Sequence, residues 1–178
     1  LSFPSSKIGS GDVAFIDIDA DALPDVIESP PNTPTQYTRW RNRGPDPSGT
    51  VSFAPPGPIG APPQRLSTVG TSLLDVTGDG ITDLLYKRST ADGDFGLRPG
   101  NGRGFFGLEE LVGIGGLSTF SPLGLEDPSL RTADLDFDKR IDILRIVTNT
   151  SGVPTSIRTR YSIGFSYQTR SILLETSH

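Results

Sequence analysis

The stretch Asp75-Val76-Thr77-Gly78-Asp79-Gly80-Ile81-Thr82-Asp83 places short oxygen-bearing side chains at alternate positions. Calcium takes six to eight oxygen ligands at roughly 2.3–2.6 Å, so several short side chains must converge in one tight loop. Gly80 allows the positive φ that a sharp turn requires. The flanking Leu73-Leu74 and Leu84-Leu85 are apolar and favour strands. The stretch therefore predicts two strands joined by a loop around a hard cation.

Two further copies of this stretch are present. One reads Asp17-Ile18-Asp19-Ala20-Asp21-Ala22-Leu23-Pro24-Asp25, and the other Asp134-Leu135-Asp136-Phe137-Asp138-Lys139-Arg140-Ile141-Asp142. They begin almost equally far before and after Asp75 in the sequence. We call residues 17–25, 75–83 and 134–142 the first, second and third aspartate loops. Three copies at one spacing predict a structural repeat.

The composition favours an all-β chain with many short strands. The 178 residues include 21 glycines and 16 prolines, and no segment shows a helical period of apolar residues. Eleven of the 21 acidic residues lie in the aspartate loops, so the net charge of −5 belongs mainly to the predicted metal sites, and no conclusion about basic partners follows from it. No apolar run approaches the length that a membrane-spanning helix needs, so we expect no membrane span.

The repeat spacing divides the chain into residues 11–66, 67–124 and 125–178, with four short strands expected in each. In the first repeat we expect the third strand over 37–43 and the fourth over 50–53, and an edge or connector in the proline-rich 55–63. Residues 1–10 resemble 51–60, the close of the first repeat, and are interpreted as a surplus strand. Because the sequence has no initiator methionine or signal peptide, we expect a processed product or an excised fragment.

A repeat of this length, with an aspartate loop between its first two strands, resembles the FG-GAP/VCBS family, in which each repeat is one propeller blade. The resemblance covers nearly the whole chain and implies an all-β fold of three four-stranded propeller-type blades with up to three calcium ions, open or completed by other copies. The side-chain ligands it implies are Asp17, Asp19, Asp21 and Asp25, then Asp75, Thr77, Asp79 and Asp83, then Asp134, Asp136, Asp138 and Asp142. It also implies backbone carbonyl ligands from Leu23, Ile81 and Arg140.

The loops depart from that pattern in three places. Ala22 and Lys139 stand at the glycine position, where a positive φ costs more, and Thr77 replaces a carboxylate. We therefore expect unequal calcium affinities. An EF-hand is excluded because it needs flanking helices and a glutamate at position twelve, which only the first loop has, as Glu28.

Three further features of the sequence bear on function. Arg39, Arg41 and Arg43 share one face of a strand with Trp40 on the other, and we interpret them as a solvated face with an inward tryptophan rather than a nucleic-acid surface. The chain has no cysteine and only the terminal His178, so a nucleophile–histidine triad cannot form and we expect no enzyme. Asn149 begins an N-glycosylation sequon.

Three blades cannot close a propeller, and they leave two apolar faces exposed to water. We therefore expect an extracellular or cell-surface, calcium-stabilised structural protein that forms a homo-oligomer or polymer, since such loops fill where calcium is millimolar. Residues 1–8 could act as a donor strand to the next copy. Two alternatives stay open: an integrin-like or lectin-like adhesion propeller with a glycan or protein ligand, and a fragment of a bacterial toxin-complex shell protein, which stretches such as residues 74–80 resemble.

Overall fold

The computed structural model describes residues 4–31, 36–60, 64–88, 95–104, 109–112, 128, 130–135, 137–148, 154–163 and 166–172. In 110–112, 130, 143–148, 154–163 and 166–172 only the backbone is described. The strands are β1 (Val13–Ile16), β2 (Asp25–Glu28), β3 (Gln36–Trp40), β4 (Asn42–Pro45), β5 (Val51–Phe53), β6 (Gly57–Gly60), β7 (Thr71–Leu74), β8 (Asp83–Lys87), β9 (Phe95–Arg98), β10 (Glu110–Val112), β11 (Leu130–Ala133), β12 (Asp142–Thr148), β13 (Pro154–Ile163) and β14 (Ser166–Ile172).

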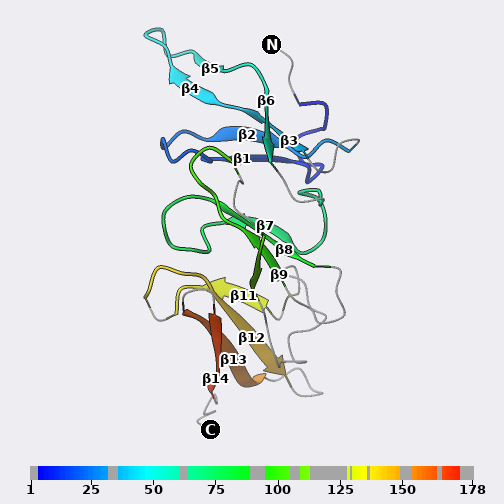
Figure 1. Ribbon diagram of the computed structural model, residues 1–178, viewed down its shortest axis with the longest axis vertical. Coiled ribbons are helices and arrows are strands. Elements are labelled where there is room, and N and C mark those ends of the chain that lie inside the picture. The colour runs from blue at the N-terminus through cyan, green and yellow to red at the C-terminus, as the bar shows by residue number, and fades with distance from the viewer. Residues whose placement is uncertain are drawn as a thin grey trace.

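The predicted all-β class is confirmed, because every regular element in the described part of the chain is a strand. Three antiparallel sheets of four strands have the orders β1-β2-β3-β6, β7-β8-β9-β10 and β11-β12-β13-β14, and β4 and β5 form a separate two-stranded sheet. None of these sheets closes on itself. Figure 1 shows the three larger sheets following one another along the long axis in chain order. The propeller arrangement stays a prediction.

The first sheet corrects two predicted strands. The expected strand over 37–43 is divided at Arg41 between β3 and β4, and the expected fourth strand over 50–53 is β5, which pairs with β4 outside the sheet. The fourth strand is instead β6, where Pro58 lies opposite Thr38. Proline has no backbone N–H to donate to a ladder, and β6 lies at the edge of the sheet, as the proline-rich sequence predicted.

The core lies between the first two sheets. The first sheet contributes the buried side chains of Ile27 on β2 and Tyr37 on β3. The second sheet contributes those of Leu84 and Tyr86 on β8. Gly96 of β9 lets Tyr86 pack closely, because a β-carbon at this glycine would lie 2.5 Å from the Tyr86 Cζ. Burial of aromatic and aliphatic side chains on both sheets fixes the second sheet against the first.

The connection between these sheets is held by polar contacts. The hydroxyl of Tyr37 donates to the carbonyl oxygen of Gln64 at 2.6 Å, and Gln64 Nε2 donates to that of Lys87 at 3.1 Å. The buried Asp12 carboxylate accepts bonds from Ser29 Oγ at 3.1 Å, Ser67 Oγ at 2.6 Å and the Arg65 guanidinium. These contacts tie the start of β1 to the segment that leads into β7.

The described part of the N-terminal segment, residues 4–10, forms bends and turns in this single chain. Ser5 Oγ and the Ser6 amide donate to Glu28 Oε1 at 2.8 and 2.6 Å, which fixes the segment to β2. Its role as a donor strand between copies stays a prediction. Within the described residues there is no helix long and apolar enough to cross a membrane.

Candidate cation loops

Each aspartate loop joins the first two strands of a four-stranded sheet, and all three have the same pattern of backbone conformation. Position six has a positive φ in every loop: 65° at Ala22, 83° at Gly80 and 71° at Lys139. The first and third loops therefore adopt the turn although they lack glycine there. The sequence did not indicate that position four shares this conformation, with φ of 57° at Ala20, 76° at Gly78 and 62° at Phe137.

Aspartates at positions one and five organise this turn through backbone amides. The position-one carboxylate accepts the amide of position six at 2.7 Å in the first loop, 2.9 Å in the second and 3.0 Å in the third. The position-five carboxylate accepts the amide of position seven, which is Leu23, Ile81 or Arg140, at 3.0, 2.8 and 2.8 Å. The predicted carbonyl ligands are thus held in corresponding places, and their binding of calcium stays a prediction.

The position-nine aspartates are Asp25, Asp83 and Asp142, and all three are fully buried. Asp25 Oδ1 accepts the Asn42 amide at 2.7 Å, and Asp83 Oδ1 accepts the Gly100 amide at 2.8 Å, each 17 residues further along the chain. Burial raises the pKa of Asp25 and of Asp83, although these amide bonds act in the opposite direction. A buried carboxylate that must ionise is stabilised by a nearby cation.

The position-three side chains carry the clearest sign that these loops suit a cation. Asp19 Oδ1 in the first loop and Thr77 Oγ1 in the second are buried oxygen atoms without a hydrogen-bond partner. Burial of such an acceptor without a partner costs about 1–3 kcal/mol, and further buried polar atoms without a hydrogen-bond partner, such as Gln64 Oε1 and Thr71 Oγ1, lie outside the loops. Both belong to the ligand set implied by the family resemblance, and oxygen is the donor type that calcium prefers. The donor atoms present therefore fit a hard cation.

The arginines of β3 and the residues after it correct one sequence interpretation. Arg39 does not lie on a solvated face: its side chain is 12% exposed and pairs with Asp19 and with Asp25 Oδ2, at 3.0 Å from the latter. Arg41 contacts Asp19 Oδ2 at 2.8 Å and Asp21 Oδ2 at 3.1 Å while its side chain remains 55% exposed. Trp40 is buried, but it does not point inward as expected: it lies on the opposite face of β3 from the core residue Tyr37.

The loops differ in how closely their carboxylates approach. Asp17, Asp19 and Asp21 each bring one oxygen within 4.8 Å of the others. No second group of this kind is found elsewhere among the described residues, so Asp75, Asp79 and Asp83 are not gathered as tightly. In the third loop, Asp134, Asp138 and Asp142 are described, whereas the predicted ligand Asp136 lies outside the described residues, as does the glycosylation site Asn149.

Contacts between neighbouring loops join them into one row. Thr82 Oγ1 of the second loop donates to the Asp17 carbonyl of the first at 3.3 Å, and the Ile141 amide of the third donates to the Val76 carbonyl of the second at 3.3 Å. In each case a residue at position eight of one loop donates to a backbone carbonyl at position one or position two of the preceding loop. The row follows one edge of the stack, on the left of Figure 1.

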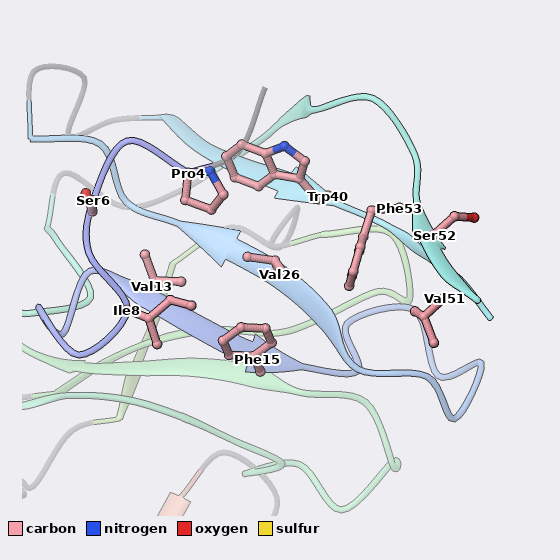
Figure 2. Close-up of a pocket in the computed structure, with 10 residues that line it drawn as sticks. All are labelled: Pro4, Ser6, Ile8, Val13, Phe15, Val26, Trp40, Val51, Ser52 and Phe53. Atoms are coloured by element: carbon pink, nitrogen blue, oxygen red, sulfur yellow. The ribbon is translucent and has the colours of Figure 1, made fainter. Parts of the chain in front are cut away.

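A second feature is an apolar groove of about 480 Å³ on the outer face of the first sheet. Figure 2 shows Val26 and Trp40 on its floor, with Phe15 on β1 and Phe53 on β5 beside them. The opposite face of this sheet carries Ile27 and Tyr37 of the core, so the sheet is apolar on both faces. A sheet that is apolar on both faces is typical of an inner layer, covered from both sides.

No protein-family model and no curated protein matches this chain.

Proposed function

We propose that this chain is a non-enzymatic, extracellular structural module whose aspartate loops bind up to three calcium ions and whose sheets stack into an oligomer or fibre. The observation that carries the proposal is the pair of buried, unpartnered oxygen atoms at position three of the first two loops. These atoms lie in loops with matching backbone conformation and matching amide contacts. A calcium ion would supply the partner that each oxygen lacks.

The row of loops supports a structural role for the cations. Each loop belongs to a different sheet, and each contacts the next through position eight. A cation that fixes the second loop would therefore also fix the surface on which the third loop rests. Calcium that binds the folded chain but not the unfolded chain would raise the free energy of unfolding. At calcium concentrations above the dissociation constant, this gain grows with the logarithm of the calcium concentration.

The apolar groove supports assembly, and we assign it to a second copy of this chain. The inner face of the first sheet packs on another antiparallel sheet, and the groove continues the same stack in the opposite direction. Ile8, Phe15 and Val51 at the groove are 75%, 55% and 52% exposed in the single chain. Covering such residues with a sheet of the same kind removes apolar surface from water.

The test is particle size by light scattering and negative-stain microscopy, with calcium and then with excess chelator. We expect large regular assemblies in calcium that dissociate on chelation. The variant Phe15→Asp should stay small in calcium, whereas Val69→Asp, which charges a residue 69% exposed outside the groove lining, should assemble normally. A small monodisperse particle in both conditions would refute assembly, and binding of a glycan or protein by that particle would favour the adhesion alternative.

A further inference from the structure

We infer that Arg39 and Arg41 act as a built-in cation of the first aspartate loop, so that this loop binds calcium more weakly than the second despite having one more carboxylate. The inference rests on the proposed calcium function and ranks its sites. Arg39 approaches Asp19 and Asp25, and Arg41 approaches Asp19 and Asp21. Three of the four predicted side-chain ligands are thereby paired with guanidinium groups.

The ion pairs of Arg39 and Arg41 with the first loop involve carboxylates that are shielded from water, which strengthens the attraction. The Asp25 side chain is fully buried and that of Asp19 is 11% exposed, so neither carboxylate is screened by water as a surface group is. Like charges repel, so a nearby positive charge favours the close approach of carboxylates. The two guanidinium groups supply that charge and explain why Asp17, Asp19 and Asp21 converge within 4.8 Å of one another.

The second loop has no such arginines. The register pairs Ile27 with Arg39 in the first sheet and Leu85 with Leu97 in the second, so Leu97 occupies the place of Arg39. Two residues further, Pro99 stands where the first sheet has Arg41. Within the described part of the chain, no lysine or arginine forms an ion pair with Asp75, Asp79 or Asp83.

The charge balance therefore reverses the ranking that the number of aspartates suggests. Two guanidinium groups leave the four carboxylates of the first loop at −2, whereas the three of the second loop remain at −3. A calcium ion entering the first loop must also displace Arg41 or share Asp19 and Asp21 with it. The second loop keeps an unpartnered ligand oxygen, Thr77 Oγ1, without a competing side-chain cation.

The test is a calcium titration of the full chain followed by amide chemical shifts, which report each loop separately. The amides of Ala22 and Leu23 report the first loop, and those of Gly80 and Ile81 the second. In the wild type we expect the second loop to fill at a calcium concentration at least about tenfold lower than the first. The variant Arg41→Gln should lower the midpoint of the first loop by about tenfold or more and leave the second unchanged.

The matched control is Arg43→Gln, which removes an exposed arginine two residues away that forms no ion pair with a described loop aspartate. It should leave both midpoints unchanged. If the second loop binds calcium but Arg41→Gln does not strengthen the first, the inference is wrong and the proposed function stands. If the first loop fills before the second in the wild type, the inference is likewise overturned. If no loop binds calcium in any variant, the proposed function itself fails.

Discussion

The amide of Ile141 in the third aspartate loop donates to the carbonyl oxygen of Val76 in the second at 3.3 Å. Close to this bond, the second and third loops lie so near one another that only glycine fits at residue 78, which is position four of the second loop. A β-carbon there would come well inside 3.0 Å of the Lys139 carbonyl oxygen. Position four of the third loop, by contrast, holds Phe137, whose side chain is 88% exposed. The demand for glycine therefore comes from the neighbouring loop as well as from φ.

The first prediction compares Gly78→Ala with Gly80→Ala. Both glycines have a positive φ, which costs an alanine about 1–2 kcal/mol, but a β-carbon on Gly80 meets no atom within 4 Å. We expect Gly80→Ala to lose about that amount and Gly78→Ala to lose clearly more, because the Lys139 backbone must move. Urea unfolding monitored by circular dichroism measures both free energies. Equal losses would show that the contact between the second and third loops is not tight in solution.

The second prediction concerns the buried Asp83. Its two oxygens accept the amides of Val76, Thr77 and Gly100 at 2.8, 3.0 and 2.8 Å. We expect Asp83→Ala to lower the free energy of unfolding by about 3 kcal/mol or more even in chelator, because buried amides are left without acceptors.

The control for this prediction is Asp79→Ala. Asp79 is exposed and accepts the Ile81 amide, so we expect a loss of about 1 kcal/mol in chelator. Unfolding is followed as for the glycine variants. A loss for Asp83→Ala no greater than that for Asp79→Ala would mean that Asp83 serves the cation alone and contributes little to the loop without it.

The third prediction is a pH dependence at Asp12. Burial raises the pKa of this carboxyl, but the hydrogen bonds from Ser67, Arg65 and Ser29 outweigh burial and hold the pKa below its usual 3.8. A lowered pKa in the folded state means that Asp12 contributes stability above about pH 4, and that this stability is lost as pH falls through the folded-state value.

We therefore expect Asp12→Asn to be less stable than wild type by about 2 kcal/mol at neutral pH, since bonds to a charged group are lost. The difference in the free energy of unfolding between wild type and variant should shrink as pH falls below about 4. Thermal unfolding of the wild type and the variant from pH 2.5 to pH 7 measures this difference. A gap that stays constant with pH would contradict the assignment.

The fourth prediction concerns Tyr37, whose side chain is fully buried and donates to Gln64. Burial, followed by the charge of Asp12, raises the pKa of this phenol far above its usual value. We expect Tyr37 to ionise only when the chain unfolds in alkali, which absorbance of the tyrosinate would show as a cooperative step. Tyr37→Phe should remove that tyrosine from the step and cost about 1 kcal/mol through the lost hydrogen bond. Gradual ionisation of every tyrosine before unfolding would contradict the burial.

The sequence by itself determined the strand class and the places of the loops between strands. Short aspartates between β-prone apolar residues predicted strand–loop–strand units, and these loops join β1 to β2, β7 to β8 and β11 to β12. The turn at position six was expected at Gly80, and the structure shows it also at Ala22 and Lys139, where the sequence indicated that a positive φ costs more. These features are local, so residues close in the sequence suffice to specify them.

Only the tertiary structure decided what each loop contacts. Arg39 reaches Asp25 from 14 positions away because β2 and β3 pair in a register that no local pattern reveals. The same applies to the exchange of β5 for β6 in the first sheet and to the meeting of Gly78 with Lys139. Side-chain charge is a property of sequence, but its neutralisation depends on distance, and distance between remote residues is fixed by strand pairing and by the packing of sheets.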